Sequence, residues 1–199
     1  MIILKTSDFS ERGKYYIPFN TKLCGSVEEL QAYIDRYEKR YLIDLLGCEL
    51  SELFIADLEN GVPITPIYQD LYNDICQDLT TGFNSIYYGH CGCKPKRIIS
   101  RGVKSMLQGF IFFEYMRDQP SAKGLTGVNK QKAENAEMVP FGTWGISAYY
   151  NESIEDYQNI QYYIYENKEN YSEFNGIKKT ITTTLFLSLI HISEPTRRS

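Results

Sequence analysis

The sequence predicts a mainly α fold: a bundle of about four or five helices with a minor β-hairpin, an N-terminal extended arm and a long loop between the last two helices. Three observations lead to this prediction. Apolar residues recur at helical spacing in residues 26–47 and 145–167. Residues 106–116 are apolar on nearly every side, as in a buried helix, and the run is too short to span a bilayer. Residues 117–137 then turn abruptly polar.

The first 25 residues predict an extended arm, because Tyr15, Tyr16 and Ile17 favour β structure while Pro18 excludes a central strand. A helix should start at Ser26, which has the spacing of a capping box with Glu29. Gly47 would end this helix as a left-handed cap. The buried stripe of this helix is predicted to be Leu30, Ile34, Tyr37, Tyr41 and Leu45.

Three shorter elements are predicted next. A second helix fits residues 49–58 and would stop at Asn60 and Gly61. A third helix, led by Pro66, fits residues 66–74. Residues 86–88 and 97–99 flank a Gly-His-Cys-Gly-Cys turn and predict the two strands of a β-hairpin.

The central helix is predicted from a cap at Ser100 to Asp118. Gly102 and Gly109 cost helix stability, so we expect another backbone to approach closely at these positions. Glu114 lies three residues before Arg117, and we expect the two to pair or to bind a partner loop. A catalytic role for Glu114 is the alternative, but no second carboxylate or histidine lies at a spacing that would complete a site.

The last long helix is predicted over residues 145–167. The chain has 17 tyrosines, several of them on this helix, and tyrosine suits surfaces that are buried in an assembly yet wet at the rim. A tyrosine-rich helix packed over the core explains the same pattern. One face of the helix would carry Ile146, Tyr150, Ile154, Tyr157, Gln161 and Ile164.

The loop at residues 119–143 combines glycine, proline and charged residues, so it offers little apolar area to offset the entropy of ordering. We expect it to be mobile in the isolated chain and ordered in an assembly. Structureless connections of this length are uncommon in compact domains unless they serve a function.

Five cysteines without a signal-peptide pattern argue against a disulfide framework. Cys24 and Cys48 flank a helix and are predicted to fill the core. A zinc site is an alternative, although Cys-x-Cys is tighter than the usual ligand spacing and a second ligand pair is missing. Its ligands would be Cys76, His90, Cys91 and Cys93. We otherwise expect no metal, no cofactor and no enzymatic activity.

The net charge of −4 argues against sequence-specific nucleic-acid binding, since the one basic cluster, residues 94–97, is small. No stretch of the sequence predicts a membrane span, and the N-terminus lacks the order of a signal peptide. These patterns predict synthesis and use in a cytoplasm.

Several segments, taken in order, resemble a family of small head-tail connector (adaptor) proteins of tailed bacteriophages that is common in gut viral sequences. The resemblance covers most of residues 1–180 and rests on the collinearity of its pieces. These are MIILKTSDF (1–9), EELQAYIDRYEKRYLIDLLG (28–47), GFIFFEYMRDQ (109–119), AENAE (133–137), YNESI (150–154) and YSEFNG (171–176).

The resemblance implies a structural virion protein, made in the cytoplasm of a bacterial host, that forms a homo-oligomeric ring at the portal–tail interface. Its partners would be further copies of itself, the portal protein and a tail or further connector protein. A small host-directed binding module or the zinc-binding protein remains the alternative. The interaction candidates are Lys123, Thr126, Val128, Asn129, Lys130, Glu134, Asn135, Tyr162 and Tyr165.

The C-terminal stretch LSLIHISEPTR, from residue 187 to residue 197, resembles the translation of a transposase-type sequencing adapter. We therefore expect residues 187–199 to be an artefact and the natural chain to depart from this sequence near Phe186. The predicted organisation is an arm at 1–25, a single helical connector domain at 26–180, and a truncated end with adapter-derived residues at 181–199.

Overall fold

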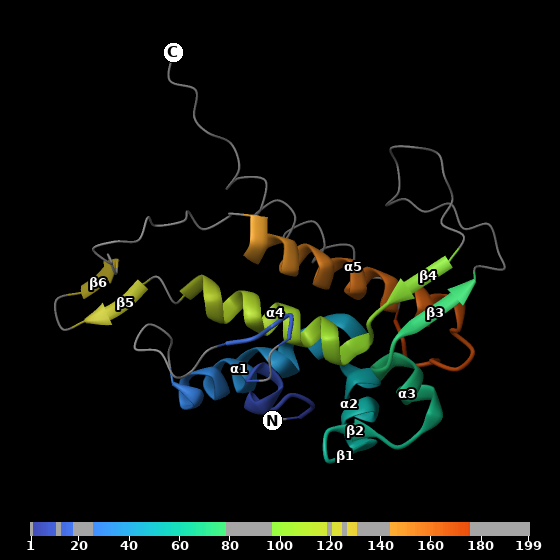
Figure 1. The fold of residues 1–199 in the computed structure, drawn as a ribbon. Coiled ribbons are helices and arrows are strands. Elements are labelled where there is room, and N and C mark those ends of the chain that lie inside the picture. Colours follow the sequence, from blue (N-terminus) through green and yellow to red (C-terminus); the bar gives the residue numbers. More distant parts are fainter. Residues whose placement is uncertain are drawn as a thin grey trace.

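A computed structural model of the chain describes residues 2–10, 13–17, 26–78, 97–118, 121–124, 127–130 and 144–175. It confirms the mainly α class (Figure 1). In chain order the elements are the 3-10 helix η1 (Thr6–Phe9), α1 (Val27–Leu46), α2 (Cys48–Ala56), β1 (Leu58–Glu59), β2 (Val62–Pro63), α3 (Pro66–Tyr72), β3 (Ile75–Asp78), β4 (Arg97–Ser100), α4 (Gly102–Asp118), β5 (Ser121–Gly124), β6 (Gly127–Lys130) and α5 (Trp144–Glu166).

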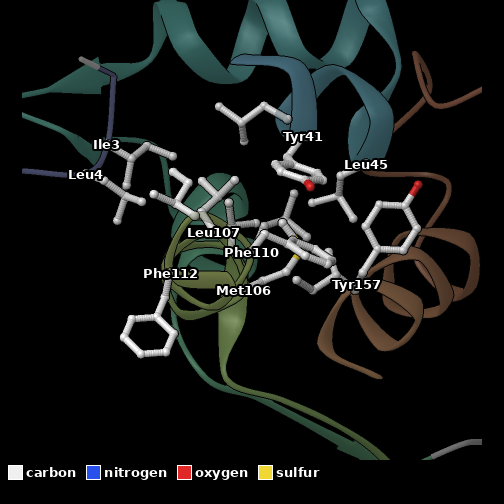
Figure 2. Close-up of a cluster of buried hydrophobic side chains, with 14 of the residues drawn as sticks. Ile3, Leu4, Tyr41, Leu45, Met106, Leu107, Phe110, Phe112 and Tyr157 are labelled. Carbon is white, nitrogen blue, oxygen red and sulfur yellow. The ribbon is translucent and has the colours of Figure 1, made fainter. Parts of the chain in front are cut away.

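The core lies where α4 packs between α1 and α5. Tyr41 of α1 stacks on Phe110 of α4 with ring centroids 4.5 Å apart, and Phe113 meets Tyr150 of α5 at 4.3 Å. Figure 2 shows Tyr41 beside Phe110, with Leu45 and Tyr157 next to the pair. As predicted, α4 is buried around most of its circumference, which explains why nearly every position of its middle section is apolar.

Helix α1 matches its predicted pattern closely. The Ser26 hydroxyl accepts a hydrogen bond from the Glu29 amide at 3.2 Å, which is the hydroxyl half of the capping box. At the other end Gly47 does end the helix, but its φ of 82° and ψ of 171° are an extended conformation that favours glycine and not the predicted left-handed helical one. Four members of the predicted stripe are buried and Tyr37 is half-buried; the buried four are Leu30, Ile34, Tyr41 and Leu45.

The described part of the N-terminal segment packs on the bundle. The buried carboxylate of Glu38 accepts hydrogen bonds from the amides of Ile2, Ile3 and Leu4 at 2.7, 2.6 and 2.7 Å. Figure 2 shows Ile3 and Leu4 next to Leu107 of α4. The segment therefore belongs to the core, and its buried apolar residues are Ile3, Leu4, Phe9, Tyr15 and Ile17.

Two predicted boundaries between residues 48 and 78 need correction. Helix α2 ends at Ala56, and Asn60 and Gly61 form the turn between β1 and β2. Their φ values of 55° and 86° fit the two-residue turn that matches strand twist. Helix α3 starts at Pro66 as predicted but ends at Tyr72, after which the chain extends into β3.

The predicted hairpin has a different partner strand. Residues 97–99 do form a strand, but β4 pairs antiparallel with β3, from Ile75 opposite Ser100 to Asp78 opposite Arg97. Residues 86–88, the predicted partner, lie outside the described residues. Burial explains the choice, because β3 contributes Ile75 and β4 contributes Ile98 to the same core.

The start of α4 also differs from the prediction. Ser100 is the last residue of β4, and the helix begins at Gly102, whose amide donates to the Ser100 hydroxyl at 3.2 Å. Gly102 has a φ of 76°, and a Cβ there would collide with the backbone carbonyls of Tyr72 and Asn73. The expected close backbone approach is thus confirmed at Gly102. At Gly109 the close neighbour is instead a side chain, the hydroxyl of Ser153 on α5.

The connection between α4 and α5 contains the β5–β6 hairpin, although composition predicted no structure there. Of the helices that the structure describes, none combines the length and apolar character needed to cross a membrane.

Candidate interaction surfaces

The β5–β6 hairpin carries four of the predicted interaction candidates in its strands: Lys123, Val128, Asn129 and Lys130. Lys123 pairs with Val128 and Lys130 with Ser121, so the register places Lys123, Val128 and Lys130 on one face of the ribbon. Asn129, paired with Ala122, falls on the other face. Thr126, Glu134 and Asn135 lie outside the described residues.

A network of charged and tyrosine side chains fixes the end of α4, where the chain leads into this hairpin. Glu114 accepts a hydrogen bond from the Tyr41 hydroxyl at 2.8 Å and pairs with Arg117 at 2.5 Å. Arg117 also contacts Asp118 at 3.1 Å, and Asp118 accepts from the Tyr33 hydroxyl at 2.8 Å. The predicted pairing of Glu114 with Arg117 is therefore confirmed.

The electrostatics of this network favour a structural role for Glu114. Burial and the neighbouring Glu114 carboxylate raise the pKa of Tyr41, so its hydroxyl stays a proton donor at neutral pH. Burial and the Asp118 carboxylate do the same for the pKa of Tyr33. One oxygen of Glu114 accepts from the Tyr41 hydroxyl and the other forms an ion pair with Arg117, an arrangement that favours a structural role over acid–base work on a substrate.

The tyrosines of α5 serve mainly the core. The predicted face is largely confirmed: Ile146 is half-buried, while Tyr150, Ile154, Tyr157, Gln161 and Ile164 are buried. The two candidates on this helix differ, since Tyr162 is half-buried against the core and Tyr165 is 42% exposed.

A second ionic cluster, which the sequence analysis missed, lies at the start of α4. The buried carboxylate of Asp156 accepts from the Arg101 amide at 2.9 Å, from Arg101 Nε at 2.9 Å and from Arg101 Nη2 at 2.6 Å. Arg101 also reaches Glu152 at 3.0 Å, and Lys14 pairs with the same carboxylate. Burial and the nearby Arg101 charge lower the pKa of Lys14.

A signal for this cluster existed in the sequence. Ser153, Asp156 and Ile160 follow helical spacing and are all buried, so a wider predicted face of α5 would have included Asp156. The Asp156 carboxylate of α5 binds Ser100 and Arg101, the two residues before α4, so this clasp joins the start of α4 to α5.

A third surface was also missed: α2, the β1–β2 hairpin and α3, which we call the acidic lobe (residues 48–72). Between residues 41 and 78 the sequence contains no lysine, arginine or histidine. It does contain the carboxylates of Asp44, Glu49, Glu52, Asp57, Glu59, Asp70, Asp74 and Asp78. A count of charge along the chain would have found this block.

The acidic lobe also exposes large apolar side chains from three of its elements. Leu53 of α2 is 44% exposed, Val62 of β2 is 49% exposed, and Ile67 of α3 is 37% exposed. Ile64, between β2 and α3, is 60% exposed. Several exposed apolar side chains in one charged segment are typical of a protein interaction surface.

The backbone of the acidic lobe is held together by side-chain hydrogen bonds. Asp57 accepts from the amides of Ile64 and Thr65 at 2.9 and 2.8 Å, and these bonds together with the Thr65 hydroxyl lower the pKa of Asp57. Gln69 donates to the carbonyls of Pro63 and Ile64 at 3.1 and 3.0 Å. The exposed apolar side chains are therefore carried on an ordered frame.

A hollow of about 420 Å³ lies between the acidic lobe and the N-terminal segment. Its walls contain no histidine, cysteine or carboxylate, and Lys5 is its one charged residue, so it offers no pair of groups for acid–base or nucleophilic catalysis. The lining residues are Ile2, Ile3, Lys5, Ile55, Leu58, Asn60 and Gly61.

Of the four ligands named for the zinc alternative, the structure describes one, Cys76. Cys76 is exposed on β3, and His90, Cys91 and Cys93 lie outside the described residues. Within the described ranges, no three histidine, cysteine or acidic side chains gather closely enough to hold a metal ion. The prediction that Cys48 fills the core is wrong, because Cys48 starts α2 at an exposed position. Cys24 is not among the described residues.

In comparisons with known proteins, no family model, no curated protein and no solved structure matches this chain.

Proposed function

We propose that this chain is a structural virion protein, a head-tail connector that forms a ring at the portal–tail interface of a tailed bacteriophage. Its function is to bind neighbouring subunits in a fixed geometry. The proposal starts from the family resemblance of residues 1–180, and the architecture of the chain supports it.

The observation that carries the proposal is the β5–β6 ribbon, which lies beyond the end of a rigid helix (Figure 1). Glu114, Arg117 and Asp118 form ion pairs at the end of α4, the helix that the ribbon follows in the chain. A hairpin of eight paired residues is only marginally stable alone. Neighbouring protein surface would stabilise it, and a ring of subunits supplies that surface.

The test uses the full chain purified from a bacterial host, examined by mass photometry and negative-stain electron microscopy. We expect ring-shaped particles of one copy number, formed either alone or on adding the portal protein encoded by the same genome. A chain that stays monomeric at micromolar concentration and does not bind that portal would contradict the proposal.

A matched variant replaces residues 121–130 with a short glycine–serine linker. We expect this variant to keep the helical circular dichroism of the native chain and to lose ring formation. Unchanged rings would remove the ribbon from the proposal.

A further inference from the structure

We propose that copies of this chain associate head to tail, with the basic face of the β5–β6 ribbon of one copy docked on the acidic lobe of the next. This inference rests on the proposed function, because it supplies the contact between neighbouring ring subunits. Three properties of the chain support it: the charge of the acidic lobe, the charge of the ribbon, and their positions in the fold.

The acidic lobe has a strongly one-sided charge and no internal compensation. Glu49, Glu52 and Glu59 are exposed, and none of them forms an ion pair with another described residue. The exposed Leu53 lies on α2 with Glu49 and Glu52, and the exposed Val62 pairs with Glu59 across the β1–β2 hairpin. Such a surface fits a partner that brings positive charges around an apolar residue.

The ribbon has the matching composition. From residue 119 to residue 133 the sequence contains Lys123, Lys130 and Lys132 but no acidic residue. The register puts Lys123 and Lys130 on the same face as Val128. A ribbon face that carries two lysines and a valine complements a surface of carboxylates and exposed aliphatic groups. Association through these charges should weaken as salt is added.

The two surfaces lie at opposite ends of α4 (Figure 1). The acidic lobe adjoins its start, where Tyr72 and Asn73 contact Gly102, and the ribbon follows its last residue, Asp118. With 17 residues, α4 is about 25 Å long. This length keeps the ribbon and the lobe of one copy apart, so we expect the ribbon to meet the lobe of another copy. A contact between two different surfaces of identical subunits is heterologous, and such contacts close into rings when the rotation allows.

Charge reversal in the full chain tests the contact. One variant carries Glu49→Lys, Glu52→Lys and Glu59→Lys, which makes the lobe net positive because only Asp57 and Asp70 then remain as carboxylates. The second carries Lys123→Glu and Lys130→Glu, which makes the ribbon negative. Each variant alone then presents like charges at every contact, and we expect association to weaken at least about tenfold by mass photometry. The control carries Glu155→Lys and Lys168→Glu, both exposed on or after α5 and outside the two surfaces.

Mixing the two charge-reversed variants gives the decisive measurement. A positive lobe then meets a negative ribbon, and a negative lobe meets a positive ribbon, so we expect the mixture to assemble. In the native chain, carbodiimide coupling should also join a ribbon lysine of one copy to a lobe carboxylate of another, identified by mass spectrometry with isotope-mixed protein.

The outcomes separate this inference from the proposed function. If the native chain forms rings and neither reversed variant weakens them, the lobe–ribbon contact is wrong while the connector proposal stands. If association depends on the reversals but yields open chains that do not bind a portal, the contact stands and the connector proposal fails. If the mixture stays monomeric while the control assembles like the native chain, the inference is overturned.

Discussion

The two ends of α4 are held in different ways. At its start, the backbone of Gly102 lies directly against the carbonyls of Tyr72 and Asn73, and the buried Asp156 binds both the amide and the guanidinium of Arg101. At its end, the contacts described above are between side chains: Glu114 binds Tyr41 and Arg117, and Phe113 packs on Tyr150. The backbone contact at Gly102 leaves room for glycine alone. In a network of side chains, by contrast, one hydrogen bond or ion pair can be removed while the others remain. We therefore expect substitutions to cost more at the start than at the end.

The largest effect is expected for Gly102→Ala. The new methyl group would collide with two carbonyl oxygens, and alanine is strained at a φ of 76°. We expect a loss of about 3 kcal/mol or more in the free energy of unfolding, measured by urea denaturation. Gly109→Ala is the comparison, since the methyl group there would meet side chains alone, chiefly the Ser153 hydroxyl and also the Tyr15 hydroxyl. Adding Ser153→Ala should recover much of the loss at Gly109, and no second-site change of this kind should rescue Gly102→Ala.

The next effect is expected for Asp156→Asn. The amide keeps the size of the carboxylate but removes the negative charge that faces Arg101 at 2.6 Å. We expect a loss of about 2 kcal/mol in the free energy of unfolding, because hydrogen bonds to charged groups contribute about 1.5–3 kcal/mol each and Glu152 still faces Arg101. Glu155→Gln, one residue away and exposed, is the control and should change stability by less than about 0.5 kcal/mol. Equal losses in the two variants would show that the clasp contributes little.

A smaller effect is expected at the end of α4 for Glu114→Gln. The amide oxygen still accepts from Tyr41, and Arg117 keeps its contact with Asp118. We expect a loss of about 1 kcal/mol, together with faster hydrogen exchange in the last turn of α4. A loss larger than that of Asp156→Asn would reverse the proposed order of the two ends.

The last prediction concerns stability at alkaline pH. At neutral pH we expect no change in the free energy of unfolding from these groups. Burial, with Glu114 as a neighbour, raises the pKa of Tyr41 and of Tyr150 above the usual value of 10. The unfolded chain releases these protons at a lower pH than the folded chain does, so the free energy of unfolding should fall as the pH rises above about 10. Absorbance at 295 nm should show late titration that coincides with loss of circular dichroism. Tyr41→Phe should reduce this pH dependence, whereas Tyr16→Phe, at an exposed position, should leave it unchanged.

The candidate surfaces could be predicted from the sequence only in part. Composition and the family resemblance pointed to Lys123, Val128 and Lys130, but the pairing that puts them on one face of a ribbon is a matter of register. The acidic lobe was detectable as a block of charge, yet its exposed Ile64 and Val62 could not be told from core residues without knowing where α2 and α3 pack.

The sequence by itself determined the long helices, since an amphipathic or fully apolar stretch at helical spacing constrains only its own neighbours along the chain. Helices α1, α4 and α5 were predicted to within about two residues at each end, apart from the residues around Ser100. Tertiary structure decided the rest: the strand that pairs with β4, the burial of the N-terminal segment on Glu38, and the clasp of Asp156 on Arg101. Each of these joins residues at least 19 positions apart. A strand edge, a backbone amide and a buried charge all need a hydrogen-bond partner, and a local sequence pattern does not show which distant residue provides it.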